Sequence, residues 1–473
     1  MRTEDISVAA ENAPASLSRA TTVWCELGAP NFTRLLAVMH AELRDNAVPG
    51  ASLGLLQRGR ILLAKNLGVT DRETRAPVTE RTVFQLGSVS KFITAIAVVL
   101  LAERGEIDLH APIGRYSQWL EADLGALTAH QLLTHTAGLK DGGALYGSRT
   151  ELDLRGSLAD WGRELMFTCP GEVFSYSNPG YSLVGLLVES VTARTFAEAL
   201  RELVFAPLAM QDSAVGAHVA TDSACSAGHA RARDGSVRAV RLLADNVAYR
   251  PAGYICSTSQ DLGRLLRALL DDGRLDGAQV LPPTLLERVT TMHVTLPGHA
   301  QRGYGYGLYV HHSADRRIAV HTGFNAGFGA RVCLCPDARG AVIALTNRQA
   351  QTLPRSTQAA MDILAPVAIP MNRALSHSKH TPQQAANAQY VGTYAQYGPP
   401  VVVHEKAGTL WLRSGGINMS LRPIGTHRFA CATSDGEKPI EVVFTERDDS
   451  GFRYLYAQSR AFRRSEPGIV DHA

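Results

Sequence analysis

The stretch that begins at residue 88 constrains the fold of this chain more than any other feature of its sequence. After the tetrapeptide SVSK (residues 88–91), the chain continues FITAIAVVLLAE, which would be apolar on nearly every side of a helix. A helix of this kind is normally buried, and Gly105 is a typical residue to end it. The protein must therefore enclose this helix, and Lys91 in its first turn must lie in or near the interior.

The composition is that of a globular protein large enough to bury such a helix. The chain has 473 residues, of which 45% are hydrophobic and 19% charged, and this length predicts two or three domains. The formal net charge is +3 and the basic residues are scattered, so neither nucleic acid nor an anionic membrane is expected as a partner. The densest basic run, residues 231–241, is interpreted as a solvated loop.

Cysteine usage and the N-terminal segment bear on where the protein acts. The seven cysteines include no CxxC pair, and no HExxH motif occurs, so we expect no metal site and no cofactor. Residues 1–24 carry early acids and lack the apolar core of a secretory signal. No window of about 18 uncharged apolar residues predicts a membrane span. Because reduced thiols also fit a reducing compartment, we expect a cytoplasmic protein.

The first half of the chain has recognisable helical and hairpin patterns. Residues 1–30 are predicted to be a polar leader with little structure, and residues 31–46 a helix. A β-hairpin is predicted over residues 48–71, because two apolar runs flank a turn signal at residues 57–60. Residues 110–250 carry mainly helical patterns that Gly, Pro and Asn interrupt.

The second half is predicted to begin with a helix and to continue in strands. Residues 251–273 are helical in pattern, and Ser257 or Ser259 could cap this helix. An antiparallel meander follows, closed by a helix near residues 355–364. Its strands are predicted at residues 304–312, 317–323, 329–336 and 340–347.

The C-terminal region is predicted to be a separate β unit. Residues 366–389 are polar and contain three prolines, so they are interpreted as a linker. From residue 390 to residue 465, short strands recur at regular spacing. This pattern favours a small antiparallel barrel or sandwich.

Ser88 and Lys91 form a candidate catalytic pair. Side chains at positions i and i+3 of a helix lie on one face, so the lysine could take the proton of the serine. Burial would favour the neutral amine that this step requires. The free N–H groups of the helix N-terminus could stabilise an oxyanion built on Ser88.

A lone SxxK can equally be a helix cap beside a surface lysine. A second copy, Ser376 to Lys379, lies in the predicted linker, where we expect no catalysis. Ser90 adjoins Lys91, but neighbours on a helix do not face each other. A rival nucleophile is Ser52 in a GxSxG sequence; that motif needs a strand before it and a helix after it. Because a hairpin strand follows instead, Ser52 is interpreted as a strand residue.

Two further motifs raise the catalytic interpretation above these alternatives. Tyr176 and Asn178 lie in a YSN sequence just before a predicted helix, where a phenol could relay a proton and an amide could hold a substrate. His321, Thr322 and Gly323 form an HTG sequence on a predicted strand, where glycine lets a substrate backbone lie close. The order SxxK, YxN and HTG is far more specific than any one motif.

In these three motifs the chain resembles the penicillin-recognising serine hydrolases, and in particular their class C β-lactamase-like branch. The sequences LLTHTAGL at residues 132–139 and PAGYICST at residues 251–258 support the resemblance. It implies an α/β fold over residues 31–365, in which helices flank an antiparallel sheet and a helical insertion occupies about 110–250. Residues 390–465 look like the lipocalin-like domain attached to some members, which implies a small antiparallel β-barrel.

The resemblance also implies roles for the motif residues. Ser88 would be the acylated nucleophile, and Lys91 and Tyr176 the general base and acid pair. Asn178 would bind the acyl amide of the substrate. The backbone N–H groups of Ser88 and Phe324 would form the oxyanion hole.

The third motif departs from the β-lactamase pattern. His321 lies where β-lactamases have the lysine of KTG, and histidine is mostly neutral near pH 7. We therefore expect weak β-lactamase activity; relatives with histidine here tend to be esterases, D-aminopeptidases or acyltransferases. Thr322 and Gly323 are expected to bind substrate beside it. His135, in the LLTHTAGL sequence, is expected to be structural.

The sequence thus predicts a serine hydrolase that forms an acyl-Ser88 intermediate on an ester or peptide-like amide, from a small molecule or a peptide. Two alternatives stay open. In a cytosolic acyltransferase or peptide macrocyclase, an amine would capture the acyl group; a carrier protein would then be a partner, and a basic patch should border the cleft. In an inactive binding module, Ser88 would have no chemical role. The oligomeric state stays open.

Overall fold

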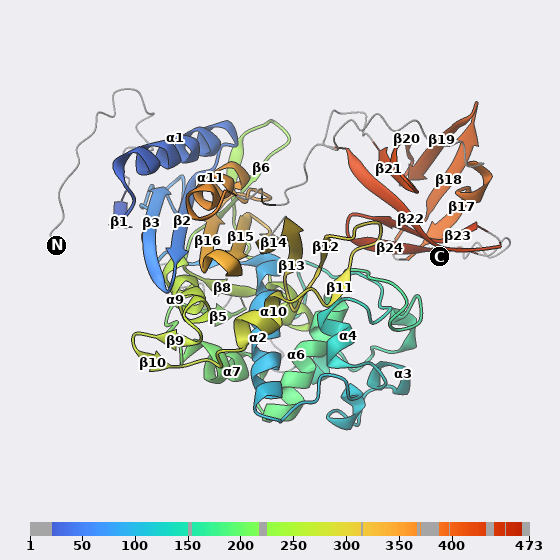
Figure 1. Ribbon diagram of the computed structural model, residues 1–473, viewed down its shortest axis with the longest axis horizontal. Coiled ribbons are helices and arrows are strands. Elements are labelled where there is room, and N and C mark those ends of the chain that lie inside the picture. The colour runs from blue at the N-terminus through green and yellow to red at the C-terminus, as the bar shows by residue number, and fades with distance from the viewer. Residues whose placement is uncertain are drawn as a thin grey trace.

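A large antiparallel sheet and a separate β-barrel organise the chain (Figure 1). The computed structural model describes residues 21–149, 154–216, 225–313, 316–366, 369, 387–396, 398–431, 439–449 and 451–465. The second SxxK copy and almost all of the predicted linker lie outside these residues. Among the described residues, none of the helices combines the length and apolar character needed to span a bilayer.

The central sheet has nine strands in the order β1-β3-β2-β16-β15-β14-β13-β12-β11. These strands are β1 (Thr21–Cys25), β2 (Gly50–Gln57), β3 (Arg60–Gly68), β11 (Val294–Thr295), β12 (Arg302–Tyr304), β13 (Tyr309–Ser313), β14 (Arg316–Asn325), β15 (Phe328–Cys335) and β16 (Gly340–Thr346). The predicted hairpin over 48–71 and the predicted meander are confirmed. The meander differs at its start, where a loop from Gly305 to Leu308 separates β12 from β13.

The polar-leader prediction for residues 1–30 is wrong at its C-terminal end. Strand β1 pairs with β3 at the edge of the sheet, and helix α1 (Ala29–Asp45) begins soon after it. Residues 1–20 lie outside the described part of the chain. The sequence TTVWC has the β-branched and aromatic residues of a strand, but it is short and the polar residues around it hide this signal.

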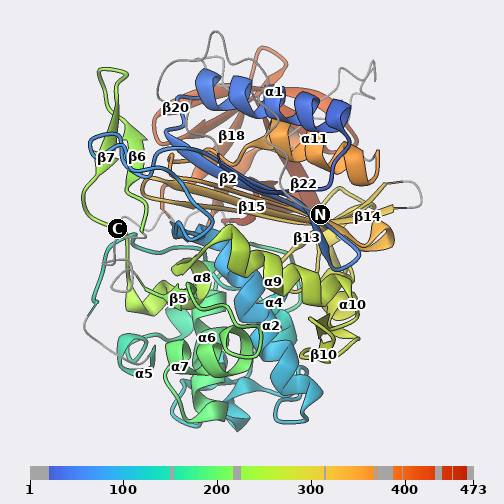
Figure 2. The same ribbon diagram turned by 90° about the vertical axis from the view of Figure 1, so that its left-hand side faces the viewer.

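Helices cover both faces of the sheet (Figure 2). Helices α1 and α11 (Pro354–Leu364) pack together on one face, and α2 (Ser90–Glu103), α9 (Ser259–Leu270) and α10 (Leu285–Thr290) lie on the other. Because both faces are covered, β15 and β16 are buried along their whole length. Helix α2 is buried from its first residue through Leu101, which explains why it is apolar on every side.

The helical insertion is predicted correctly only in its first part. It contains α3 (Ala122–Gly125), α4 (Ala129–Leu133), α5 (Leu154–Ser157), α6 (Asn178–Thr192), α7 (Phe196–Leu200), the π-helical turn η4 (Arg201–Phe205) and α8 (Arg250–Gly253). Between η4 and α8 the structure has strands instead: β5 (Ala214–Val215) and the hairpin of β6 (Gly228–Arg231) and β7 (Val237–Val240).

The β6–β7 hairpin corrects the interpretation of residues 231–241 as a loop. Asp234 accepts a hydrogen bond from the backbone N–H of Ser236, and Gly235 has a positive φ of 82°, so the two residues form the tight turn that a DG sequence favours. The many arginines conceal the alternation of the flanking strands.

The region 251–273 also contains more than the predicted helix. A short strand, β8 (Ile255–Ser257), pairs with β4 (Phe84–Gln85) and β5 before α9 begins. The cap of α9 is Thr258, whose side chain accepts from the N–H of Asp261, and not Ser257 or Ser259. The strand fixes the backbone through residue 257, so only the following residue is free to cap the helix.

The C-terminal strands form a closed antiparallel barrel, so the barrel prediction is confirmed over a sandwich. The strands are β17 (Gly392–Ala395), β18 (Val401–Lys406), β19 (Thr409–Ser414), β20 (Ile417–Gly425), β21 (Arg428–Cys431), β22 (Ile440–Asp448), β23 (Gly451–Ala457) and β24 (Arg460–Arg464). One apolar core fills its interior. A second apolar cluster joins Tyr454 and Tyr456 of β23 to Val173 and Phe174 beside the YSN motif, so the barrel packs directly against this segment.

Candidate active site

Ser88 lies in a tight turn at the start of the buried helix. It is the middle residue of the 3-10 turn η1 (Gly87–Val89), and α2 continues from Ser90. Ser88 is partly exposed, whereas Lys91 is fully buried. Gly87 has a positive φ of 52°, and a Cβ there would lie 2.4 Å from the backbone N of Phe324. A glycine is therefore required for η1 to approach β14 so closely.

Lys91 makes three polar contacts in the interior. Its Nζ donates to Asn178 Oδ1 at 2.7 Å and to the Ala252 carbonyl at 2.8 Å, and it lies 3.4 Å from Ser88 Oγ. Burial lowers the pKa of Lys91 from 10.5 to about 7. A neutral amine keeps two N–H donors, which match the two short contacts. Its lone pair is then left for the hydroxyl proton of Ser88.

Tyr176 flanks the same pair. Its hydroxyl lies within hydrogen-bond reach of the Ser88 side chain, and Lys91 Nζ lies 4.7 Å from the centre of its ring. Burial raises the pKa of Tyr176 well above 10.0. The phenol therefore keeps its proton near neutral pH and can donate it to a leaving group.

Asn178 is the first residue of α6, and Ser177 caps that helix by accepting from the N–H of Gly180. The backbone N–H and the side-chain Nδ2 of Asn178 both donate to Asp141 Oδ1, at 2.8 and 3.0 Å. Its Oδ1 accepts from Lys91. Both ends of the amide are thus occupied, and Asn178 holds the lysine in place.

His321 lies on β14 and is only 2% exposed. Its Nδ1 is 2.8 Å from the carbonyl of Thr322, so Nδ1 carries the proton and Nε2 is left as an acceptor. Within the described part of the chain, Nε2 has no hydrogen-bond partner. Burial, with a smaller effect of Lys91, lowers the pKa of His321 to about 3. The residue is therefore a neutral imidazole and not a substitute for a lysine cation.

The HTG motif brings a second backbone N–H beside Ser88. A Cβ on Gly323 would lie 1.9 Å from the Leu86 carbonyl and 2.9 Å from the Ser88 nitrogen. This close approach of β14 to η1 places the N–H groups of Ser88 and Phe324 next to each other, as an oxyanion hole requires. The Phe324 side chain is half exposed, and Thr322 is half-buried on the same strand.

The other candidate residues have structural contacts. Ser52 lies in β2, as expected, and its Oγ is 2.6 Å from Asn66 Oδ1. The hydroxyl of Ser90 accepts from the backbone N–H of Ile255. His135 accepts from the N–H of Ser177 through Nδ1 at 3.1 Å. Its ring also lies 4.4 Å from that of Tyr176, so His135 supports the YSN segment.

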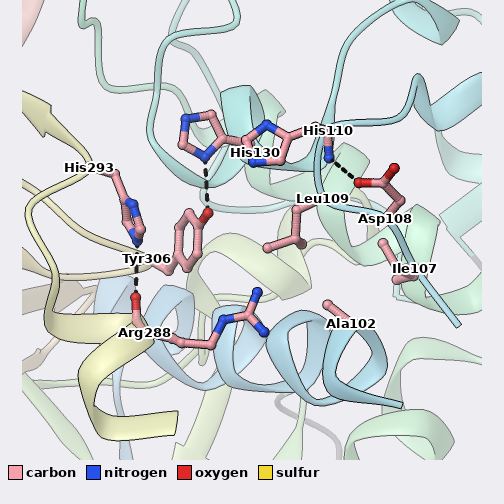
Figure 3. Close-up of a pocket in the computed structure, with 9 residues that line it drawn as sticks. All are labelled: Ala102, Ile107, Asp108, Leu109, His110, His130, Arg288, His293 and Tyr306. Atoms are coloured by element: carbon pink, nitrogen blue, oxygen red, sulfur yellow. Dashed lines mark hydrogen bonds between the residues drawn. The ribbon is translucent and has the colours of Figure 1, made fainter. Parts of the chain in front are cut away.

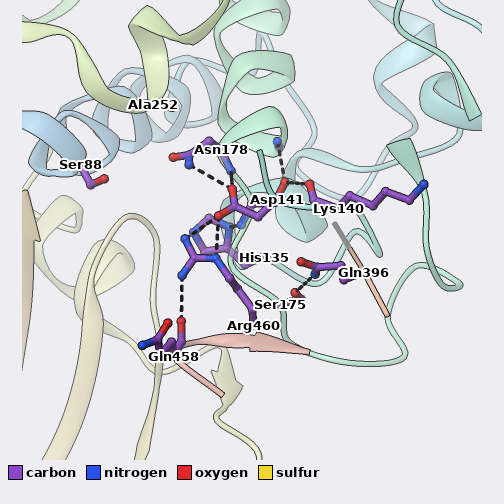
Figure 4. A network of polar contacts seen from close by, with 12 residues as sticks. Ser88, His135, Lys140, Asp141, Ser175, Asn178, Ala252, Gln396, Gln458 and Arg460 are labelled. Atoms are coloured by element: carbon purple, nitrogen blue, oxygen red, sulfur yellow. Dashed lines mark hydrogen bonds and ion pairs between the residues drawn. The ribbon is translucent and has the colours of Figure 1, made fainter. Parts of the chain in front are cut away.

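Asn178 belongs to a network of polar contacts that Figure 4 shows. Two residues of this network, Asp141 and Arg460, are not predicted from the sequence. Asp141 comes two residues after the LLTHTAGL sequence, and its position there was the only signal that could have drawn attention to it. Arg460 reaches Asp141 from the start of β24, 319 residues later in the chain. No sequence pattern connects an arginine of the barrel to motifs so far away.

A separate pocket of about 470 Å³ lies away from these motifs (Figure 3). It is lined by residues that include His110, His130, His293, Tyr306 and Arg288. His130 Nδ1 lies 2.9 Å from the Tyr306 hydroxyl, and His293 Nε2 lies 3.0 Å from the Arg288 carbonyl. The described residues contain no group of three His, Cys, Asp or Glu side chains arranged to hold a metal ion.

The fold and this arrangement of serine, lysine, tyrosine and histidine define a class of protein. A family model described as Beta-lactamase matches residues 33–365, and the chain belongs to that family. The resemblance drawn from the three motifs is thereby confirmed, together with the fold that it implied.

Individual relatives are similar over different parts of the chain. Esterase EstB of Burkholderia gladioli is 35% identical over 196 residues, which are 38% of this chain and 50% of EstB. Protein flp of Staphylococcus aureus strain MRSA252 is 22% identical over 331 residues, 67% of this chain and 63% of flp. The chain thus spans between half and two thirds of the length of these relatives. The crystal structure of SurE superposes with a TM-score of 0.77 at 26% identity and covers 92% of this chain and 99% of SurE.

Proposed function

We propose that the protein is a serine hydrolase that acylates Ser88 with an ester or a peptide-like amide. The observation that carries the proposal is the state of Lys91. Its burial lowers its pKa to about 7, its two short hydrogen bonds match the two N–H donors of a free amine, and its remaining direction is toward Ser88 Oγ. A neutral lysine held in this way is a general base for the serine.

In the proposed acylation step, Lys91 takes the hydroxyl proton of Ser88 as Oγ attacks the carbonyl carbon of the substrate. The N–H groups of Ser88 and Phe324 stabilise the oxyanion, and loss of one such donor typically costs about 3–4 kcal/mol. The carbon–oxygen or carbon–nitrogen bond to the leaving group then breaks. Tyr176 delivers a proton to the leaving group and recovers one from Lys91.

In the proposed deacylation step, water attacks the acyl-Ser88 carbonyl and gives one proton to Lys91, which passes it to Oγ as the bond between the acyl group and Oγ breaks, and the acid leaves. His321 has a buried acceptor, Nε2, without a partner among the described residues, and we assign it the role of orienting this water or the substrate. Thr322 and Gly323 would align the substrate backbone along β14. Because His321 is neutral, the carboxylate of a β-lactam would find no cation there, and we expect β-lactams to be poor substrates.

The similarity to esterase EstB supports an ester substrate. A second candidate function, acyl transfer to an amine, is supported by similarity to a different protein. The solved structure of SurE with D-Leu covers 93% of this chain at 25% identity. We therefore propose that a D-amino acid residue fits beside Ser88, either in the acyl donor or as the amine that captures the acyl group.

A carrier protein as acyl donor is a further part of that second candidate. The β6–β7 hairpin, which presents the exposed Arg231 and Arg233, packs against the β14–β15 turn: a Cβ on Gly327 would lie 2.5 Å from the Cα of Gly228. We propose that an acidic carrier would contact these arginines.

The test is a product analysis with a p-nitrophenyl ester, with and without D-leucine amide. Free acid in both mixtures, lost in Ser88→Ala and kept in Ser52→Ala, supports the hydrolase. Amide product that dominates when the amine is present favours the transferase. Ser88→Ala with the full activity of the wild type refutes the role of Ser88, whereas no turnover and no acyl adduct in the wild type would favour the binding module.

A further inference from the structure

The barrel contributes backbone contacts to the catalytic motif. The turn between β23 and β24 lies against the YSN segment, where the Ser459 carbonyl accepts from the N–H of Tyr176 at 2.8 Å. The N–H of Ala461 donates to Ser175 Oγ at 3.2 Å, and Gln396 Nε2 donates to the same oxygen at 2.7 Å. Ser459 and Ala461, the residues on either side of Arg460, therefore both hold the segment that carries Tyr176.

Between these backbone contacts, Arg460 extends into the active site (Figure 4). Its Nε donates to Asp141 Oδ2 at 2.7 Å, and a second guanidinium nitrogen lies 2.5 Å from the same oxygen. Its Nη1 donates to the Gln458 carbonyl at 2.9 Å, which holds the side chain in this direction. The guanidinium also lies 5.3 Å from the centre of the Tyr176 ring.

Asp141 transmits this contact to Asn178. Its side chain is only 8% exposed, and its other oxygen, Oδ1, accepts both N–H groups of Asn178. A carboxylate can only accept hydrogen bonds, so the NH₂ end of the Asn178 amide must face it. The carbonyl end then faces Lys91, which it contacts at 2.7 Å.

The charges of this network act in opposite directions on Lys91. The carboxylate of Asp141 favours the ammonium form of Lys91, and the guanidinium of Arg460 disfavours it. Without Arg460, the negative charge of Asp141 would be uncompensated beside the base. The other titratable groups that face Lys91 are uncharged near neutral pH: His135, His321, Tyr176 and Tyr181.

We propose that Arg460 of the barrel is a positioning residue for the acylation of Ser88, acting through Asp141 to orient Asn178 and to keep Lys91 in its free-amine form. This inference rests on the proposed acyl-enzyme function. It makes the barrel a part of the active site, because Arg460 is the cation that pairs with Asp141 among the described residues.

The test compares the pH dependence of Ser88 acylation in three variants of the full chain. In Arg460→Met, the acid limb of the rate profile moves to higher pH, and the rate at pH 7 falls at least tenfold. In Asp141→Asn, the acid limb moves to lower pH, even though the maximal rate falls because one amide oxygen cannot serve both Asn178 and Arg460 as the two carboxylate oxygens do. In the double variant, the limb returns toward its wild-type position. Opposite shifts that cancel are a signature that mere loss of stability does not produce.

A second arginine of the barrel gives a matched control. Arg453 pairs with Glu172 across the same interface, and within the described part of the chain its side chain makes no polar contact with Asp141 or Asn178. Arg453→Met should leave the acid limb in place. Arg460→Lys keeps a charge without the planar fork, so it should keep the wild-type limb with a reduced maximal rate, and it serves as the test if Arg460→Met does not fold.

Three results would overturn the inference. The first is an unchanged pH profile of acylation in Arg460→Met, with kcat/KM within twofold of the wild type. The second is a shift of the acid limb in Arg453→Met equal to that in Arg460→Met. The third is a shift of the acid limb in the same direction in Arg460→Met and Asp141→Asn. Failure of the proposed function is recognised separately, because Ser88→Ala would then retain the activity of the wild type.

Discussion

The pKa of Lys91 makes the pH dependence of acylation a demanding test of the proposed mechanism. At the ordinary value of 10.5, roughly one Lys91 amine in 3,000 would be free at pH 7, whereas a pKa of about 7 leaves about half of them free. Burial thus supplies roughly a thousandfold gain in usable base. We expect the rate of Ser88 acylation to rise about tenfold between pH 6 and pH 8 and then to level off.

The measurement is the burst of p-nitrophenol release on rapid mixing of enzyme and ester, between pH 5 and pH 9. Burst rates report acylation and not deacylation. The profile should follow a single ionisation near pH 7 and disappear in Lys91→Met. His321, with a pKa of about 3, and Tyr176, with a pKa well above 10.0, cannot produce a limb in this range.

Three outcomes would contradict this reasoning. A rate that does not change between pH 6 and pH 8 would mean that the free amine of Lys91 is not required. A rate that still rises tenfold per pH unit up to pH 9, without levelling off, would mean that burial does not lower the pKa of this lysine. A near-normal burst in Lys91→Met would remove the residue from the mechanism altogether.

Three further expectations follow from the same geometry. Tyr176→Phe should reduce acylation at least a hundredfold while the circular dichroism spectrum stays that of the wild type, and a smaller loss would exclude the phenol as proton donor. Gly323→Ala should destabilise the fold by about 1–3 kcal/mol and slow acylation, because the new methyl group would lie 1.9 Å from the Leu86 carbonyl oxygen. An unchanged midpoint of urea unfolding would refute this expectation. Because the unfolded chain binds the Lys91 proton more tightly than the folded one, the free energy of unfolding should rise between pH 7 and about pH 10 by at most about 1.4 kcal/mol per pH unit. Lys91→Met should remove this rise. The same pH dependence of the free energy of unfolding by urea in both proteins would count against the expectation.

The sequence by itself determined the elements whose patterns are local. The apolar run after SVSK could only be a buried helix, and the alternation around residues 57–60 could only be a hairpin. The order of SxxK, YxN and HTG was enough to indicate which side chains meet, because in that order the three motifs resemble those of the penicillin-recognising serine hydrolases. Polar or basic residues hid the alternation of apolar side chains in the arginine-rich β6–β7 hairpin and in β1. The sequence pattern therefore predicts a loop and a polar leader in place of these strands.

Only the tertiary structure decided the electrostatics of the site. The pKa of Lys91 is lowered because packing removes water from its side chain, and no local sequence records how completely a side chain is enclosed. The neutrality of His321 follows from burial in the same way. Asp141 and Arg460 meet because a barrel formed by the last eight strands closes against the YSN segment, 319 residues from one partner to the other. Charge compensation across that distance depends on the docking of two domains, which is a property of the folded chain and not of any of its segments.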